Sequence, residues 1–304
     1  MRITNNITTQ NALRTLQRGN REIAAASERV YSGLRFQRAS EDPVAASQVM
    51  RTSGSLRALE QYRRNVDEAT ARMSAEEGVL DQLTSVLMRA DELGISQATG
   101  TANAETRKVA KAEVDQLLRH AVQLGNSRYG EGFLFGGAQA STAPFTYVES
   151  DPVTGLPSFT TTNPSGEHRV EISAGQVIST NHHGTDVFGT AAPDGGPLAA
   201  LRELSEALAA DDQDAIGAAT AKVHASVGDL QKLVGDVGAR MNQLEVTGAN
   251  LASLEITLTT FKSDLQEVDF EQAVTELVGR QTAFQAAMLA TSRVMGMNLA
   301  DYLR

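Results

Sequence analysis

Apolar residues recur every seven positions through the last third of the chain, and this heptad repeat limits the possible folds more than any other feature. The stripe occupies the first and fourth positions of successive heptads and comprises Leu244, Leu251, Leu254, Leu258, Phe261, Leu265 and Val268, with Thr247 in its single polar slot. A stripe this narrow predicts a helix that packs against another helix. Residues 244–268 would extend about 37 Å as a helix, at about 1.5 Å per residue.

The repeat changes phase near Asp269, and a second apolar stripe follows. Asp269 and Gln272 resemble a capping box, in which the aspartate accepts the first free N–H of a helix. The change of phase predicts a joint between two helices. The second stripe contains Phe270, Val274, Leu277, Phe284, Met288, Met295 and Tyr302, with polar residues at Gln281, Thr291 and Asn298.

The first third of the chain mirrors this arrangement with two further stripes. The first comprises Leu13, Leu16, Ile23, Val30 and Leu34. The second comprises Leu59, Tyr62, Val66, Ala69, Met73, Leu80, Leu83 and Leu87, with Glu76 in its seam. Gly33 punctuates the segment between them, and Ser40 or Asp42 is placed to cap a helix whose first turn holds Pro43.

The middle of the chain has a different pattern. Residues 130–197 are broken by Gly, Pro, Asn and Asp, and short alternating runs at 145–148, 158–162 and 169–173 predict the strands of a small β-rich insert. Helices are expected around this insert at about 104–126, from 198 onward, and at about 212–234.

Together these patterns predict a mainly α fold with a β-rich insert. An amphipathic helix gains most of its stability from packing, so the N-terminal and C-terminal arms should pair in an elongated antiparallel helical bundle or coiled coil. Both termini would then lie at one end and the small β domain at the far end. We expect three parts: terminal helical arms forming an inner assembly core (1–42 with 269–304), a helical rod (43–130 with 198–268), and a β-rich outer domain (131–197).

Charge and composition exclude several classes of partner. The formal net charge of −10 argues against a nucleic-acid binder, which needs a basic face, and against an anionic membrane as partner. The absence of cysteine rules out a disulfide-stapled fold. The sequence has no apolar signal-peptide core and no stretch of about 18 apolar residues that could span a membrane. By these rules alone, a cytosolic protein would be expected.

The sequence contains no recognisable catalytic pattern. The pair His182-His183 lies in a loop rich in Gly and Asp, which we interpret as a solvated turn rather than a metal site. There is no His-Glu-x-x-His zinc motif, no Gly-x-Ser-x-Gly elbow and no phosphate-binding loop. We therefore expect no enzyme activity, no cofactor and no bound metal.

Short motifs near both ends resemble one known family. Residues 5–51 resemble the N-terminal arm of bacterial flagellins and their hook-associated relatives, through Asn5-Asn6, Ser32-Gly33-Leu34-Arg35, Ser40-Glu41-Asp42 and Ala45-Ala46. Residues 250–304 resemble the matching C-terminal arm. Within this family, two motifs look like hook-associated protein 3: Asp42-Pro43-Val44-Ala45-Ala46 and the terminal Asn298-Leu299-Ala300-Asp301-Tyr302-Leu303.

The resemblance implies a structural protein of the extracellular flagellum that joins the hook to the filament. It implies export by the flagellar type III apparatus, which would account for the missing signal peptide. The implied partners are copies of the chain in a ring, another hook-associated protein on the hook side, flagellin on the filament side, and a cytosolic export chaperone on the C-terminal arm. Neither nucleic acid nor a membrane is expected as a partner.

The arms and the bend between them supply the candidate assembly interface. Its residues are Leu13, Leu16, Ile23, Val30, Leu34, Arg35, Asp42, Pro43, Phe270, Val274, Leu277, Phe284, Met288, Met295, Leu299 and Tyr302. Arg35 and Asp42 have two readings: a solvated surface pair worth under about 1 kcal/mol, or an intersubunit contact that fixes the bend.

Three other functions compete with a junction role. A flagellin subunit would share the arms but polymerise alone into long fibres. A secreted coiled-coil adhesin or effector would be a monomer that binds a target through its β insert. The stripes could also be the core of an ordinary helical bundle with no role in assembly.

Overall fold

The computed structural model describes residues 2–302 except 101, 138–140, 152–154, 163–165 and 191–194, with side chains described for Ile7 and from residue 10 to 293. Two units make up the chain: residues 1–58 with 253–304, and residues 59–252. The long helices α2 (Pro43–Gln97) and α6 (Gln213–Gln266) contribute to both units. The finer three-part division expected from the sequence stays a prediction.

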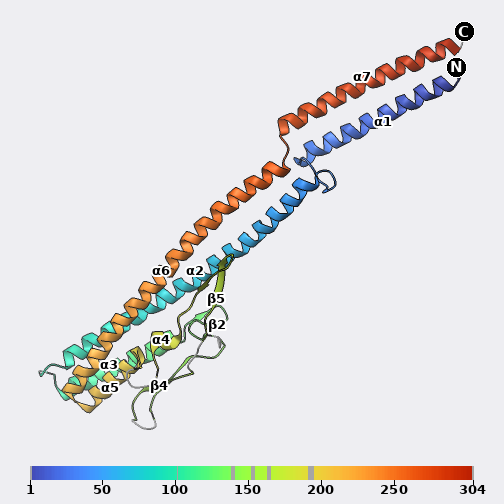
Figure 1. Cartoon of the computed structure of the whole chain (residues 1–304). Helices are drawn as coiled ribbons and strands as arrows, with labels where there is room; N and C mark the ends of the chain where they lie inside the picture. Colours follow the sequence, from blue (N-terminus) through green and yellow to red (C-terminus); the bar gives the residue numbers. More distant parts are fainter. Residues whose placement is uncertain are drawn as a thin grey trace. The chain divides into compact units, whose positions relative to one another are not determined.

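Two long helices from opposite ends of the chain pair in the first unit. These are α1 (Arg2–Ser32) and α7 (Phe270–Tyr302), and they lie side by side with both chain ends together (Figure 1). The apolar seam between them explains the pairing, since neither stripe is wide enough to be buried alone. The expected pairing of the N-terminal and C-terminal arms is confirmed.

Paired backbone segments separate these helices from the next ones. Gly33 has a φ of 70°, which glycine adopts without steric cost, and α1 ends there. Leu34 then forms an antiparallel bridge with Glu267, and the Val268 N–H donates to the Gly33 carbonyl at 2.9 Å. Leu34 therefore does not continue the helical stripe in which the sequence placed it.

Aspartate side chains cap the two helices that leave this bend. Asp42 Oδ1 accepts the N–H of Ala45 at 3.0 Å at the start of α2, and Pro43 is the first residue of that helix. Asp269 Oδ1 accepts the N–H groups of Glu271 and Gln272 at 3.0 and 3.1 Å. The predicted joint near Asp269 is therefore confirmed.

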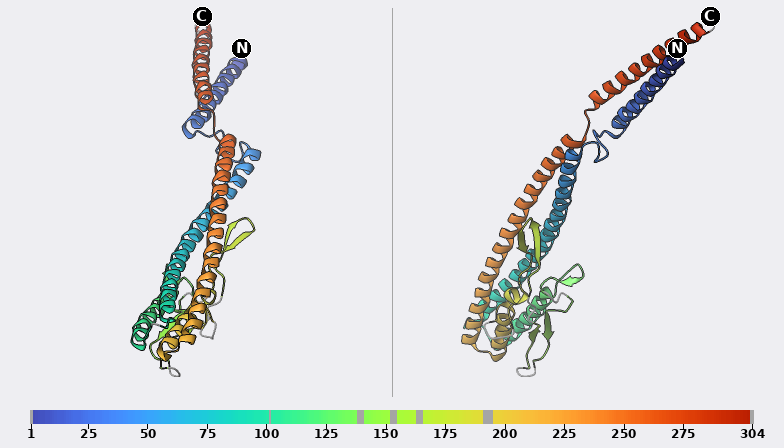
Figure 2. Two further views of the ribbon diagram at one scale, coloured as in Figure 1. Left: turned by 90° about the vertical axis from the view of Figure 1, so that its left-hand side faces the viewer. Right: turned by 45° about the vertical axis from the view of Figure 1, so that its right-hand side comes forward.

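The second unit is held together by an apolar core between its helices. In the views of Figure 2, α2 and α6 run beside each other, with α3 (Ala104–Gly125) and α5 (Pro197–Ala210) close by. The stripe predicted on α2 is buried here, and Met73, Leu80, Leu83 and Leu87 are fully enclosed. The sequence predicted a helix at 212–234, and the predicted end is wrong. Helix α6 is continuous from Gln213 to Gln266.

The β-rich insert also belongs to the second unit. Its strands form three two-stranded antiparallel sheets: β1 (Arg128–Tyr129) with β2 (Gly132–Phe133), β3 (Phe145–Val148) with β4 (Ser158–Thr161), and β5 (Arg169–Ser173) with β6 (Gln176–Ser179). Phe188, in the short helix α4 (Gly184–Phe188), meets Phe135 and Phe145 with ring centroids 5.0 and 5.3 Å apart. The three predicted strands are confirmed, and β1, β2 and β6 are additions.

Candidate assembly surface

Close packing of small residues brings α1 and α7 together. A Cβ placed on Gly19 would lie 2.8 Å from the Phe284 ring, so glycine at this position lets the two helices approach. Ala26 on α1 and Ala273 on α7 are both buried. The Gly19–Phe284 contact sets the level at which these two antiparallel helices meet.

Ion pairs across the seam hold the same register. Glu276 binds Arg29 at 3.1 Å and Arg280 at 2.7 Å, and Arg280 also binds Glu22 at 2.7 Å. The hydrogen bond from Arg280, reinforced by the charge of Arg29, lowers the pKa of Glu276 despite some desolvation. The hydrogen bond with Glu276 likewise raises the pKa of Arg280. These charged groups are partly exposed to solvent. Their ion pairs therefore contribute only modestly to the orientation of α1 against α7.

The sixteen predicted interface residues fall into different environments. Leu13, Phe270 and Met288 are exposed by 55, 62 and 44%. The half-buried members are Leu16, Ile23, Val30, Leu34, Val274, Leu277 and Phe284. The side chains of Met295, Leu299 and Tyr302 lie outside the described part of the structure.

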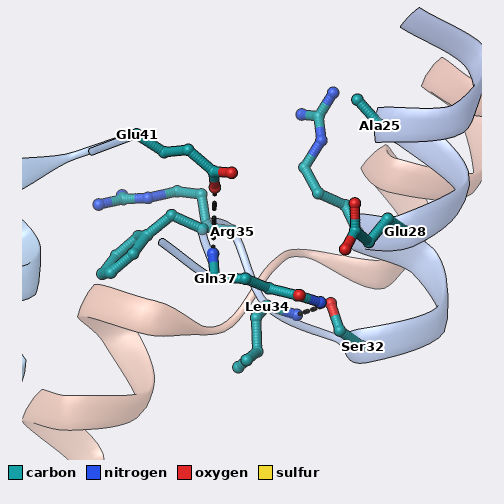
Figure 3. A pocket seen from close by; sticks show the side chains of 9 residues that line it. Ala25, Glu28, Ser32, Leu34, Arg35, Gln37 and Glu41 are labelled. Carbon is teal, nitrogen blue, oxygen red and sulfur yellow. Dashed lines mark hydrogen bonds between the residues drawn. The ribbon is translucent and has the colours of Figure 1, made fainter. Parts of the chain in front are cut away.

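The bend between α1 and α2 forms a pocket of about 330 Å³ that both charged and apolar side chains line (Figure 3). Arg35 binds Asp42 at 3.3 Å, and Glu41 Oε2 accepts the Gln37 N–H at 3.1 Å. Phe36 turns inward and packs with Ala45, Ala46, Val49 and Leu265. The Arg35–Asp42 pair is half-exposed and within one chain, as the reading of a surface pair expects, and its part in contacts between subunits stays a prediction.

Exposed apolar residues concentrate on the first unit. It carries 12 of the 17 large exposed hydrophobic side chains among the described residues, although it is the smaller unit. Sequence reasoning missed several of them because they lie off the main stripes: Ile7, Tyr31, Val44, Met50, Ile256, Val278 and Leu289. Large exposed apolar patches are typical of surfaces that bind other proteins, so this unit carries the candidate assembly surface.

The His182 imidazole occupies a buried site in the second unit, so its interpretation as part of a solvated turn was wrong. Its ring binds Glu76 at 2.7 Å through Nδ1 and Asp236 at 2.9 Å through Nε2, and its side chain is only 9% exposed. The hydrogen bond that the His182 ring donates to buried Glu76 raises the pKa of His182, against the opposing effects of desolvation and nearby Arg240. The polar slot at Glu76 in the second stripe was the sequence signal for this contact.

Neither a metal cluster nor a membrane span is found in the described regions. No group of three or more His, Asp or Glu side chains there is arranged to hold a metal ion. No helix in that part of the chain combines the length and hydropathy needed to cross a bilayer.

Two family descriptions match this chain at its two ends. Residues 3–140 match the bacterial flagellin N-terminal helical region, and residues 220–303 match the bacterial flagellin C-terminal helical region. Together these matches cover more than two thirds of the chain. They include both α1 and α7, whose pairing forms the candidate surface.

Individual relatives align along the whole chain. Flagellar hook-associated protein 3 of Escherichia coli (strain K12) is 26% identical over 321 residues, which cover 98% of each protein. The flagellin of Bacillus subtilis (strain 168) is 26% identical over 324 residues that cover 100% of each. A solved structure of a putative flagellar hook-associated protein from Vibrio parahaemolyticus gives a TM-score of 0.66 at 17% identity, over 75% of this chain and 100% of that one.

Proposed function

Because this chain belongs to the flagellin family of structural proteins of the bacterial flagellum, we propose that it is the junction protein that joins the hook to the filament. The observation that carries the proposal is the apolar surface on the paired terminal helices. Burying an exposed leucine, valine or phenylalanine stabilises a contact by about 1.5–3 kcal/mol. Assembly with copies and neighbours would supply that burial.

Two motifs favour a junction protein over a filament subunit. Pro43 follows the capping Asp42 in the Asp-Pro-Val-Ala-Ala run, and the chain ends in Asp301-Tyr302-Leu303-Arg304. Both motifs are similar to hook-associated protein 3. The full-length relative of that name in E. coli supports the same choice, whereas the flagellin of B. subtilis keeps the filament subunit as a second candidate.

The proposed partners follow from a position between two different structures. One layer of copies would meet another hook-associated protein on one side and flagellin on the other. Before assembly, a cytosolic chaperone would cover the C-terminal arm, where Phe270, Val278, Met288 and Leu289 are exposed. The protein would leave the cell through the flagellar type III apparatus and act outside it, in a structural rather than a catalytic role.

Deleting the gene and examining the cells by electron microscopy tests this function. We expect hooks without filaments, with flagellin released into the medium, because flagellin would have no surface on which to polymerise. Cells that keep hooks with normal filaments would contradict the junction role. Cells that export flagellin poorly would show an export defect instead, so secreted flagellin is measured in the same cultures.

Polymerisation of the purified chain tests the filament alternative. A flagellin subunit would grow into long fibres when seeded by its own fragments. A junction protein should form no long fibres under the same conditions, because contacts between its copies would produce a layer of limited size.

A further inference from the structure

We propose that His182 is a proton-dependent latch that holds the β5–β6 hairpin on helices α2 and α6. When the imidazole loses its proton, the hairpin lifts while the apolar core of the helices stays closed. The segment that moves is residues 168–183, and all of the groups involved belong to the second unit. The inference concerns a single chain, so it holds for a junction protein and for a filament subunit alike.

One face of the hairpin is buried and the other is exposed. Ile172 and Ile178 are 0% and 6% exposed, whereas Val177 on the opposite face is 50% exposed. Side chains alternate between the two faces of a strand, so the two isoleucines share the buried face. A sheet of two strands cannot bury one of its faces by itself. The buried face must therefore lie against other elements of the unit.

Helices α2 and α6 hold the backbone of the hairpin on this side. Asn65 of α2 donates its side-chain N–H to the Glu171 carbonyl at 2.7 Å, and β5 lies beside α2 (Figure 1). Arg240 of α6 donates to the Ser179 carbonyl at 3.0 Å. An amide and a guanidinium do not titrate near neutral pH, so these contacts anchor the hairpin without making the anchor depend on pH.

His182 lies between a carboxylate of each helix. Its Nδ1 is 2.7 Å from Glu76 Oε1 on α2, and its Nε2 is 2.9 Å from Asp236 Oδ2 on α6. An ionised carboxylate can only accept hydrogen bonds, so both ring nitrogens must carry a proton to satisfy both contacts. The geometry therefore fits the charged imidazolium, which joins the end of the hairpin to both helices at once.

Glu76 makes the neutral ring unfavourable. This residue is fully buried, and its Oε1 also accepts the main-chain N–H of His182 at 3.2 Å. Its Oε2 has no hydrogen-bond partner among the described residues. A neutral imidazole has one N–H, so one carboxylate would face a lone pair. Because a buried charge is costly unless it is paired, lifting the hairpin would be favoured by the water that then reaches Glu76.

The surrounding charges determine the direction of the pH response. The charged and titratable groups around His182 and its two partners are Arg72 and Glu76 of α2, Asp236 and Arg240 of α6, and the neighbouring His183. The hydrogen bond to Glu76 raises the pKa of His182 above its ordinary value, against the effects of burial and of Arg240. The latch is therefore complete below pH 6.5 and is lost as the pH rises through the raised pKa.

The reactivity of a single thiol tests the latch, since the native chain has no cysteine. Ile178→Cys places the thiol on the buried face of the hairpin. Its reaction with dithiodipyridine is measured at pH 5.5 and pH 8.5. Each rate is divided by that of a small free thiol at the same pH, which removes the effect of thiol ionisation. Ala219→Cys is the control for the helices: it is buried on α6, about 25 Å along the helix from Asp236.

We expect the relative rate of Ile178→Cys to rise about tenfold from pH 5.5 to pH 8.5, because the hydrogen bond of a charged group to a buried partner is lost. Adding His182→Gln should abolish the rise, since glutamine does not titrate. Adding His168→Gln should preserve it, because His168 is an exposed histidine of the same hairpin. The relative rate of Ala219→Cys should stay the same at both pH values.

Two results would overturn the latch: no rise in Ile178→Cys, or a rise that persists with His182→Gln. An equal rise in Ala219→Cys would show that the helices open together with the hairpin, which contradicts local release. Circular dichroism confirms that each variant is folded. The comparison of Ile178→Cys with Ala219→Cys keeps His182 in place, so it tests local release even if His182→Gln fails to fold.

Discussion

At position 19, the lack of a side chain decides how closely the two terminal helices approach. The Phe284 ring fills the space that a Cβ would need, 2.8 Å from its position. The apolar stripes in the sequence indicated that the helices would pair, but not that a glycine would set their separation. No periodicity distinguishes Gly19 from Gly279, whose Cβ would meet no atom within 4 Å.

Replacing Gly19 with valine should destabilise the α1–α7 pair. The added methyl groups must displace Phe284, and overpacking of this kind costs about 1–3 kcal/mol. Thermal loss of helicity, followed by circular dichroism, measures the effect. Gly279→Ala is the matched control and should stabilise its helix by about 0.5–1 kcal/mol, because the site is open and alanine favours helix. Equal changes in thermal stability in Gly19→Val and Gly279→Ala would contradict the close contact between Gly19 and Phe284.

Acid should weaken the same pair through Glu276. Its pKa is lowered in the folded chain by Arg280 and Arg29, so its contribution is complete above the ordinary value of 4.5. That contribution is lost as the pH falls through the lowered pKa and Glu276 takes up a proton. Circular dichroism from pH 7 to pH 3 should show less acid sensitivity in Glu276→Gln than in the native chain, because glutamine removes the titration. If Glu276→Gln were as sensitive to acid as the native chain, the acid effect would come from another group.

At the scale of the helices, the phase of the apolar repeat predicted more than residue preferences did. The shift at Asp269 located the joint between α6 and α7, and Pro43 located the start of α2. The continuity of α6 was missed because Gly235 and Gly238 interrupt its pattern, although neither glycine is in close contact with another part of the chain. The short strand β6 was missed because its residues Gln176–Ser179 give little alternation.

The candidate surface was predictable only in part from the sequence. The stripes gave the seam between α1 and α7, whereas the exposed residues Ile7, Val278 and Leu289 lie outside those stripes. The buried position of His182 depends on contacts with Glu76 and Asp236, which are 106 and 54 residues away in the chain. Local sequence patterns cannot reveal pairs at such separations.

The joint itself depends on a helix cap. Asp269→Ala removes the acceptor for two N–H groups at the start of α7, and loss of an N-cap costs about 1 kcal/mol. Urea unfolding followed by helicity should show this loss. Asp264→Ala removes a nearby exposed carboxylate that caps no helix and should change the stability of the isolated chain by less than about 0.5 kcal/mol. A larger effect from the control than from the cap variant would contradict the assignment.

Alkali should loosen the second unit at His182. Glu76 and Asp236 raise the pKa of His182 while Arg240 and burial lower it, and the net direction is upward from 6.5. The favourable contribution is therefore complete below pH 6.5 and is lost as the pH rises through the raised value. Thermal unfolding at pH 5.5 and 8.5 should differ less in His182→Gln than in the native chain. If the native chain and His182→Gln showed the same difference between the two pH values, His182 would not be the source of the pH dependence.

At the scale of the whole molecule, charge is distributed unequally. Of the net −10, residues 59–252 carry −12, with 14 basic and 26 acidic residues, and the terminal segments together carry +2. Strong like charge on the second unit favours solubility and discourages its association with copies. Exposed apolar surface is concentrated on the first unit, where charges of both signs are nearly balanced. Association between copies should therefore depend on the first unit.

The position of the chain along the flagellum tests the junction role most directly. Lys232 is 80% exposed in the second unit, and Lys232→Cys would introduce the chain's only thiol for labelling with maleimide-linked gold. Flagella that carry the native chain, which has no cysteine, measure background labelling. Electron microscopy should show gold confined to the boundary between hook and filament. Gold distributed along the entire filament would identify a filament subunit and contradict the junction role.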